Sequence, residues 1–219
     1  MGSGSQAMKQ FKLIGRSGGC VGALFSALLL STSVEAQPVD PEWPCIQRLI
    51  MEVSPAVLWP VPVEEDMASL YKKDAEVRAL SEQLGDIEQF TDTHRTMIAE
   101  FAQAKPESER EQQLTLLAVG VLDVSNRIRA DYIRGIKRYT RQQIAISEQI
   151  EATLNELSLL EDANTTSSGH SREDVVETLR WHERVYDQRE RSIQMLCERP
   201  VELEQRVSDV LRDAVQYLP

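Results

Sequence analysis

Apolar residues recur at helical spacing along most of the chain, beginning at Glu64. In residues 64–104 the spacing is mostly three, four or seven, and acidic residues occupy the first turn, where the helix dipole favours negative charge. The pattern predicts two helices, one on each side of Gly85. Their apolar positions are Met67, Leu70, Val77, Leu80, Leu84, Ile87, Phe90, Met97, Ile98 and Phe101.

A second, much longer helix is expected from Pro106 onward. It runs for about 55 residues, or roughly 80 Å at 1.5 Å per residue, and its main interruptions are Gly120 and Gly135. The apolar stripe consists of Leu114, Leu117, Val121, Val124, Ile128, Tyr132, Ile136, Tyr139, Ile146, Ile150, Leu154 and Leu157.

Residues 161–170, EDANTTSSGH, predict a loop after this helix. Ser171 followed by Asp174 favours the start of a third helix, because a serine hydroxyl at that position can accept a hydrogen bond from the first-turn backbone. The third helix is expected to run to Arg199. Pro200 is then expected to break or kink it before a final helix at 201–218.

Three helical legs of similar length, joined by short turns, predict an all-α fold. The favoured architecture for residues 64–219 is an elongated antiparallel helical bundle with coiled-coil-like packing of its long helices. The alternative is a compact four-helix bundle in which the long helix bends at Gly120 or Gly135. The sequence shows neither a strand pattern nor an internal repeat.

Residues 37–63 form a proline-rich arm before the bundle. They contain six of the nine prolines of the chain, so regular structure is confined to the stretches between them. Only residues 45–53, CIQRLIMEV, are long enough between prolines to form a short helix.

Residues 1–36 have the order of a secretory signal peptide. Basic residues precede an apolar run at 21–34, and small residues near its end predict cleavage after Ala36. The run has about 14 residues, fewer than the roughly 20 that span a bilayer, so no transmembrane anchor is expected after cleavage. Cys20 precedes the apolar run, whereas a lipidated cysteine follows it. We therefore expect a secreted, periplasmic protein.

Cleavage leaves a strongly acidic protein. The whole chain has 24 basic and 35 acidic side chains; the signal peptide removes three basic and one acidic, which leaves 21 against 34 and a net charge of −13. Such a protein repels polyanions, so we expect no nucleic-acid partner.

Two cysteines remain after cleavage, Cys45 in the arm and Cys197 near the end of the third leg. An even number of cysteines in an exported chain favours a disulfide. The arm between Cys45 and Glu64 can reach back that far when extended, at up to about 3.3 Å per residue. We therefore predict an intramolecular Cys45–Cys197 disulfide that holds the arm near Pro200. The alternatives are two free thiols or a dimer bridged through Cys45.

Motifs for catalysis and metal binding do not occur in the sequence. It has no phosphate-binding glycine-rich loop, no His-Glu-x-x-His, no Cys-x-x-Cys and no Glu-x-x-His pair of the kind that di-iron bundles use. His94 and His182 are interpreted as ordinary helix residues, and His170 as a loop residue. We expect no catalytic residue, no metal and no cofactor.

Six positive charges gather in residues 126–141 of an otherwise acidic chain. One hypothesis is a docking strip for an anionic envelope component or for another envelope protein. The other is internal pairing with acidic residues of neighbouring helices. The six residues of this basic strip are Arg127, Arg129, Arg134, Lys137, Arg138 and Arg141.

Trp43 and Trp59 stand on either side of Cys45 in the arm. An arm rich in aromatic and proline residues is either a binding element or a strap that covers one end of a bundle core. Both tryptophans are therefore candidate docking residues. We expect both to lie against helix surface.

A Trp-Pro-Cys-x-Gln stretch at residues 43–47 resembles uncharacterised exported helical proteins of Gram-negative bacteria, which carry it just after the signal peptide. The resemblance implies a periplasmic location and no particular activity. The other similar positions are Asn126, Arg127, Gly135, Arg138 and Tyr139.

These features favour a non-enzymatic periplasmic accessory protein, a helical adaptor or chaperone-like binding partner in the cell envelope. An elongated acidic bundle offers surface rather than a cleft. The first alternative is a helical bundle that binds an apolar ligand or cofactor. The second is an envelope hydrolase, which would need a pair of buried carboxylates in a concave pocket.

Overall fold

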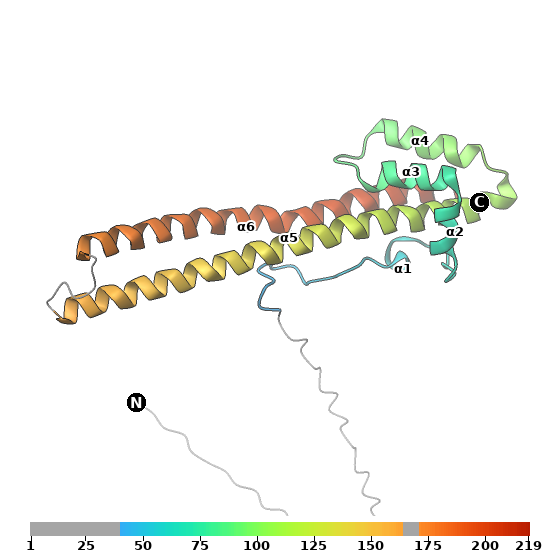
Figure 1. Ribbon diagram of the computed structural model, residues 1–219. Helices are drawn as coiled ribbons and strands as arrows, with labels where there is room; N and C mark the ends of the chain where they lie inside the picture. Colours follow the sequence, from blue (N-terminus) through green and yellow to red (C-terminus); the bar gives the residue numbers. More distant parts are fainter. Residues whose placement is uncertain (1–39, 164–170) are drawn as a thin grey trace, which may run out of the picture. The chain divides into compact units, whose positions relative to one another are not determined.

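The structure is a computed structural model that describes residues 40–163 and 171–219 (Figure 1). These residues belong to one compact unit, Val39–Pro219. The predicted signal peptide, residues 1–36, and residues 164–170 of the predicted loop lie outside the described residues. All regular secondary structure within the described ranges is helical, so the all-α prediction is confirmed.

Two of the helices are much longer than the others. α5 has 57 residues and α6 has 44, so α5 extends about 85 Å at 1.5 Å per residue. The helices of the described residues are α1 (Pro55–Leu58), α2 (Met67–Lys73), α3 (Ala75–Gly85), α4 (Asp92–Gln103), α5 (Glu107–Ala163) and α6 (Arg172–Val215).

α5 and α6 lie antiparallel and side by side (Figure 1). Their buried and half-buried positions recur at alternating steps of three and four residues, which is the heptad spacing of coiled coils. We call these positions the seam, and they confirm the prediction of coiled-coil-like packing. In α5 the seam comprises Thr115, Ala118, Leu122, Ser125, Arg129, Tyr132, Ile136, Tyr139, Gln143, Ile146, Ile150, Thr153, Leu157 and Leu160. In α6 it comprises Val175, Leu179, His182, Tyr186, Arg189, Ile193, Leu196, Pro200, Leu203, Val207, Val210 and Ala214.

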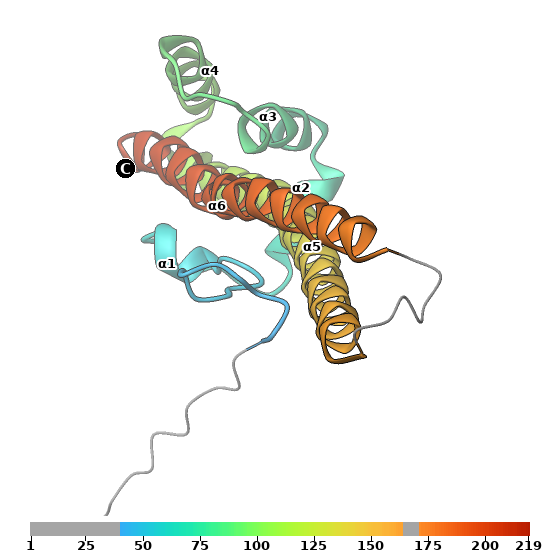
Figure 2. The same ribbon diagram turned by 90° about the vertical axis from the view of Figure 1, so that its left-hand side faces the viewer.

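The hydrophobic core lies where α1 to α4 cover the first part of α5 and the last part of α6. α3 and α4 lie on one side of the long pair, and α1 lies on the other (Figure 2). We call this part the bundle half. The remainder of the pair, residues 140–163 and 172–198, is the outer half. Fully buried core residues include Val77, Leu84, Ile98, Leu114, Leu117, Val121, Val210 and Leu211.

Residues 64–104 form three short helices instead of a leg as long as α5. Asp74 leaves the helical conformation between α2 and α3, and its carboxylate accepts hydrogen bonds from the backbone N–H groups of Glu76 and Val77, both at 3.0 Å. After Gly85 the chain turns again before α4. The region therefore folds back onto the bundle half. The expectation of three legs of similar length is wrong on this point.

Close packing of α3 on α5 requires a glycine at position 120. A Cβ atom there would lie 2.1 Å from Ser81 Oγ and 2.9 Å from Tyr71 Cδ2. α5 nevertheless continues without interruption through Gly120 and Gly135. The chain therefore does not adopt the alternative in which the long helix bends at either glycine.

α6 likewise continues through Pro200, so of the predicted break or kink the break does not occur. Pro200 has no N–H group to donate to the carbonyl of Leu196, and the helix loses one hydrogen bond. Pro200 is buried at a seam position, and Leu203 and Val207, which follow it in the seam, are buried in the core. Burial of these side chains along the same helix face offsets the lost hydrogen bond.

Gly120→Ala should destabilise the protein, because the added methyl group meets Ser81 and Tyr71 at less than contact distance. Overpacking of this kind typically costs about 1–3 kcal/mol. Gly135→Ala is the matched control: nothing lies within 4 Å of its added Cβ, and alanine is favoured over glycine inside a helix by roughly 0.5–1 kcal/mol. Urea denaturation compares the two. Equal stability of the two variants would contradict the close approach of α3 to α5.

Candidate binding groove beside a disulfide-anchored arm

A disulfide joins the arm to α6. Cys45 and Cys197 are bonded through their sulfur atoms, and their Cα atoms lie 5.5 Å apart. The predicted intramolecular pairing is therefore confirmed, in place of free thiols or a dimer bridged through Cys45. The bond lies three residues before Pro200 and holds the arm against the middle of the α5–α6 pair (Figure 1).

Residues 45–53 of the arm are not helical, so the short helix expected there is wrong. Side chains of α5 bind this stretch as an irregular, non-helical segment. Asn126 accepts a hydrogen bond from Val53 N–H (2.9 Å) and donates one to the Val53 carbonyl (3.1 Å). Arg129 Nε donates to the Ile50 carbonyl at 2.7 Å. These bonds satisfy backbone groups that would otherwise have to pair within a helix.

The two tryptophans of the arm have different surroundings. Trp59 is 4% exposed, belongs to the core and donates through Nε1 to Thr115 Oγ1 of α5 at 3.1 Å. Trp43 is half-buried, and its Nε1 donates to the carbonyl of Gln47, within the arm itself, at 2.7 Å. Trp59 therefore acts as part of a strap over the core. The docking role of Trp43 stays a prediction.

Two residues of the basic strip hold the start of the arm. Lys137 Nζ lies 2.6 Å from Asp40 Oδ2, and Arg141 Nη1 lies 2.7 Å from Glu42 Oε2. The hydrogen bond from Lys137 lowers the pKa of the Asp40 carboxyl below its ordinary value. With the disulfide, these ion pairs attach residues 40–45 to the region where the bundle half meets the outer half.

The rest of the basic strip is spread over several faces of α5. Arg129 is buried, whereas Arg127, Arg134 and Arg138 are exposed. Within the described residues, Arg138 makes neither an ion pair nor a side-chain hydrogen bond. Five of the six residues thus pair internally, and docking by the strip stays a prediction that rests mainly on Arg138. The acidic partners are Glu82 and Asp123 for Arg127, Glu204 for Arg129, and Asp131 for Arg134.

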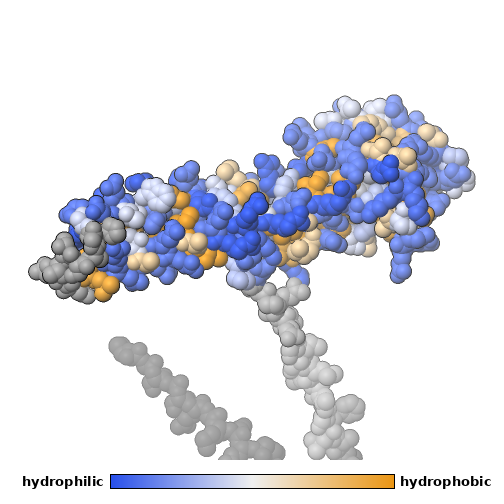
Figure 3. Space-filling model, viewed as in Figure 1, coloured by the Kyte–Doolittle hydropathy of each residue, from blue (hydrophilic) through white to orange (hydrophobic). Residues whose placement is uncertain are grey.

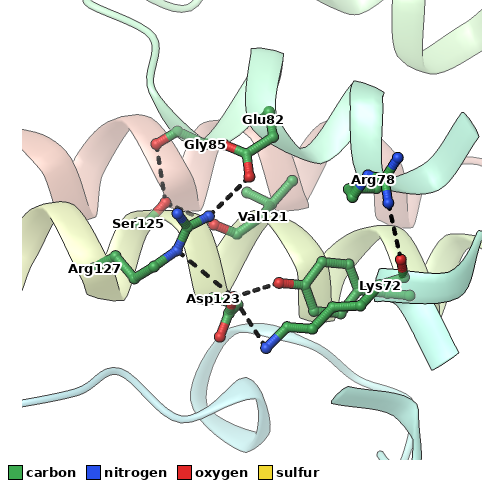
Figure 4. Close-up of polar contacts among 9 residues, drawn as sticks. Lys72, Arg78, Glu82, Gly85, Val121, Asp123, Ser125 and Arg127 are labelled. Carbon is green, nitrogen blue, oxygen red and sulfur yellow. Dashed lines mark hydrogen bonds and ion pairs between the residues drawn. The ribbon is translucent and has the colours of Figure 1, made fainter. Parts of the chain in front are cut away.

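A polar cluster connects α2, α3 and α5 in the bundle half (Figure 4). The buried Tyr71 hydroxyl donates to Asp123, whose carboxylate also lies 3.7 Å from Lys72 Nζ and 3.7 Å from Arg127 Nε. Arg127 in turn donates to Glu82 at 2.9 Å. Burial, together with the hydrogen bond to a carboxylate, raises the pKa of Tyr71 well above its ordinary value. Because each charged group has a partner, we interpret the cluster as structural.

Polar residues interrupt the seam near the disulfide. Gln143 Nε2 donates to the Tyr186 carbonyl at 3.1 Å, and its Oε1 accepts from Arg189 Nε at 3.2 Å. The Arg189 guanidinium also lies 3.9 Å from the centre of the Tyr139 ring. A polar pair in a coiled-coil seam fixes the register, because a shifted pairing would leave its groups unsatisfied.

A groove of about 590 Å³ opens beside the disulfide, between α5 and α6. Ile144 of α5 and Ile193 of α6 line its walls, and arm residues 44–47 border it. Ile144 is 43% exposed, and Ile46 is completely exposed. The groove combines apolar side chains from three segments with the disulfide itself. The sequence did not reveal it, because no single segment carries its pattern.

A second hollow, of about 730 Å³, lies between residues 86–90 and α6. It is lined by several carboxylates, among them Glu88, Glu202 and Asp209, but none of these three is buried. Glu202 lies 3.6 Å from Arg199 Nη1. A hydrolase that uses two carboxylates needs at least one held in an environment that shifts its pKa. This hollow supplies no buried pair of that kind.

The described residues contain no group of three or more His, Cys, Asp and Glu side chains placed to hold a metal ion. His94 accepts a hydrogen bond from the Thr91 N–H at the start of α4, at 3.0 Å. His182 is half-buried at a seam position. His170 lies outside the described residues. The Nδ1 atom of His182 is buried and has no hydrogen-bond partner among the described residues, so its interpretation as an ordinary helix residue stays a prediction.

The chain matches no protein-family model, no curated protein and no solved structure. Of the helices in the described ranges, none is both long enough and apolar enough to cross a membrane. Its function therefore has to be argued from the geometry of the arm, the groove and the outer half.

Replacing both cysteines, Cys45→Ser with Cys197→Ser, should lower the free energy of unfolding by about 2–4 kcal/mol, because the bond restricts a long loop of the unfolded chain. Guanidinium denaturation measures the loss. Non-reducing peptide mapping of protein purified from the envelope should recover the two cysteines in one linked peptide pair. Recovery of both as free thiols, or a Cys45 to Cys45 peptide, would contradict the intramolecular bond.

Arg129→Met should destabilise the protein by about 1.5–3 kcal/mol, the usual range for hydrogen bonds to charged groups. The substitution leaves Glu204 and the Ile50 carbonyl without their partner. Arg138→Met, in the same strip, should change the stability by no more than about 0.5 kcal/mol, because Arg138 is exposed and unpaired within the described residues. Thermal denaturation of both variants at one pH compares their stabilities. An equal loss of stability in the two variants would contradict the roles assigned to Arg129 and Arg138.

Proposed function

We propose that the protein is a non-enzymatic accessory protein of the periplasm, which binds another envelope protein as a helical adaptor or chaperone-like partner. The location rests on the order of basic, apolar and small residues in 1–36. The intact mass of protein purified from the envelope should accordingly be that of a chain that begins at Gln37. The binding role rests on the outer half of the α5–α6 pair.

The exposed apolar surface of the outer half is the observation that carries the proposal. Within residues 40–163 and 171–219, no other helix covers α5 and α6 in this half (Figures 1 and 2). Large apolar side chains remain exposed on both helices: Leu154 (47%) and Leu159 (69%) on α5, Trp181 (54%) and Met195 (63%) on α6. Figure 3 shows hydrophobic atoms at the surface of this half, between hydrophilic ones. Exposed apolar side chains gathered on one part of a surface are typical of a site that binds a partner.

The charge of the outer half indicates what kind of partner fits. Residues 142–163 of α5 carry five carboxylates and no Lys or Arg, and residues 172–198 of α6 carry seven carboxylates and five arginines, so the two stretches together have a net charge of −7. A surface that combines apolar and basic residues complements this stretch, and complementary charges accelerate association and suppress wrong partners. An anionic polymer or lipid surface would be repelled here. A protein partner is therefore favoured for the outer half.

The length of the α5–α6 pair suits an adaptor. The short helices and the core surround one half of the α5–α6 pair, while the other half projects beyond them (Figure 1). Amphipathic helices bind partners by burying an apolar stripe in a groove or against another helix. The outer half offers exposed apolar side chains, such as Leu159 and Trp181, that do not belong to the core.

Affinity capture from the native envelope tests the proposal when the wild type is compared with Leu159→Gln/Trp181→Gln. The double substitution removes apolar contact area and keeps the charge, so the amount of the main captured protein should fall several-fold. Val57→Gln is the matched control, because Val57 is an exposed apolar residue of α1 in the bundle half. The captured protein is then identified by mass spectrometry, purified and bound again in isolation.

Unchanged capture and unchanged rebinding by the Leu159→Gln/Trp181→Gln protein would refute docking by the outer half. Charge reversal at two exposed residues of the basic strip, Arg134→Glu/Arg138→Glu, is the competing arm. It should change the stability by at most about 1 kcal/mol. Loss of the partner in this variant alone, at an unchanged melting temperature, would place docking on the basic strip instead.

A further inference from the structure

We infer that the groove beside the Cys45–Cys197 disulfide binds an extended apolar segment that carries a positive charge, contributed by a partner protein. This inference rests on the proposed adaptor function and names the segment that the partner inserts. The observation behind it is that the groove continues the trough between α5 and α6 in which the arm already lies.

The arm is an internal example of an extended segment bound between α5 and α6. In the bundle half, Val53 and Leu58 of the arm lie over the trough between the long helices, where they leave only about 10 Å³ unfilled. The backbone of Val53 is bound by Asn126, and that of Ile50 by Arg129. Past the disulfide, the trough between the same two helices is open, with a volume of about 590 Å³.

The filled and open parts are related by the heptad repeat. Asn126 and Arg129, which line the filled part, stand 14 residues before Thr140 and Gln143, which line the open part. A shift of 14 residues is two heptads, so both pairs occupy the same face of α5.

The corresponding relation holds on α6. Glu204 and Val207 line the filled part, and Glu190 and Ile193, 14 residues earlier, line the open part. The open groove therefore repeats the geometry that binds the arm, and an extended segment fits it for the same reason.

The open groove also retains apolar side chains that an occupant can cover. Ile144 and Ile193 line it, and Ile46 of the arm stands completely exposed at its border. The disulfide keeps Ile46 in this place, so its exposure is a property of the folded arm. An apolar segment would bury these side chains, whereas a polar one would leave them in contact with water.

The charge of the occupant follows from one difference between the two parts. In the filled part, Arg129 forms an ion pair with Glu204. In the open part, Gln143 occupies the position that corresponds to Arg129, and Glu190 occupies the position that corresponds to Glu204. Glu190 makes neither an ion pair nor a side-chain hydrogen bond with the described residues. Glu198, on the same wall, has none either. None of the residues that line the open groove is basic, so the positive charge has to come from the occupant.

A synthetic peptide that copies the arm supplies the probe. The arm sequence 48–55 is RLIMEVSP, and the probe RLIMRVSP places arginine where the arm has Glu52. The control peptide ELIMEVSP keeps the apolar residues and replaces Arg48 by glutamate. Fluorescence anisotropy with disulfide-intact protein should show saturable binding of the basic probe and at least tenfold weaker binding of the acidic control.

Matched protein variants locate the charge. Glu190→Lys/Glu198→Lys should weaken binding of RLIMRVSP by about tenfold, which corresponds to about 1.4 kcal/mol. Glu173→Lys/Glu177→Lys alters the net charge equally on exposed positions of the same helix that do not line the groove. This control should bind the probe to within about twofold of the wild type. Circular dichroism and thermal denaturation establish that both variants are folded.

A photo-crosslinkable form of the probe locates the site. Crosslinks should map to residues 140–144 and 190–198, because these stretches form the two walls of the groove. Crosslinks confined to other residues, or an equal loss of binding in both double variants, would overturn the inference. So would saturation of the wild type by both peptides with the same affinity, or no binding of RLIMRVSP at concentrations up to about 1 mM.

A second copy of the chain is the rival occupant. Sedimentation equilibrium of the wild type should show a monomer, and a dimer that Glu190→Lys/Glu198→Lys dissociates would overturn the inference by assigning the groove to self-association.

Failure of the proposed adaptor function would give a different pattern of results. If the probe binds the groove but capture of an envelope partner does not depend on Leu159 and Trp181, docking by the outer half is refuted and peptide binding by the groove is supported. If capture depends on these two residues but the probe does not bind, only peptide binding by the groove is refuted.

Discussion

The unbroken antiparallel seam between α5 and α6 is the constraint on which the rest of the structure depends. Seam positions from Thr115 to Leu160 face those from Val175 to Ala214 at heptad spacing, so each helix fixes the direction and register of the other. The seam explains why α6 continues through Pro200, where local chemistry favours a break. It also provides the two troughs along its sides, one of which receives the arm.

The two halves of the pair differ in what surrounds the seam. In the bundle half, α5 residues outside the seam such as Leu117 and Val121 are buried in the core that α1 to α4 complete. In the outer half, residues outside the seam such as Leu159 are exposed, and the seam itself includes the polar pair of Gln143 and Arg189. Because apolar burial is the main driving force of folding, stability is concentrated in the bundle half. The outer half is therefore free to serve binding.

The arm connects the stability of the fold to its binding surface. Most of the basic strip, which stands out in the sequence, is used to hold the arm and neighbouring helices, as in the pairs of Lys137 with Asp40 and Arg129 with Glu204. Trp59 closes the core under the same strap. The arm ends its course along the trough at the disulfide, and the open groove begins there. A structural strap and a candidate peptide site thus share one trough between α5 and α6.

The sequence by itself determined the all-helical class and the long helix α5, and it predicted the disulfide. Helical periodicity is a local property, and Cys45 has only Cys197 as an intramolecular partner when the predicted signal peptide, which contains Cys20, is left out. The tertiary structure alone decided that residues 64–104 fold back as short helices, that residues 45–53 are not helical, and that α6 passes through Pro200. Each of these outcomes depends on which side chains meet across elements far apart in the chain. The groove was hidden for the same reason, because its walls and its border come from three segments that only folding brings together.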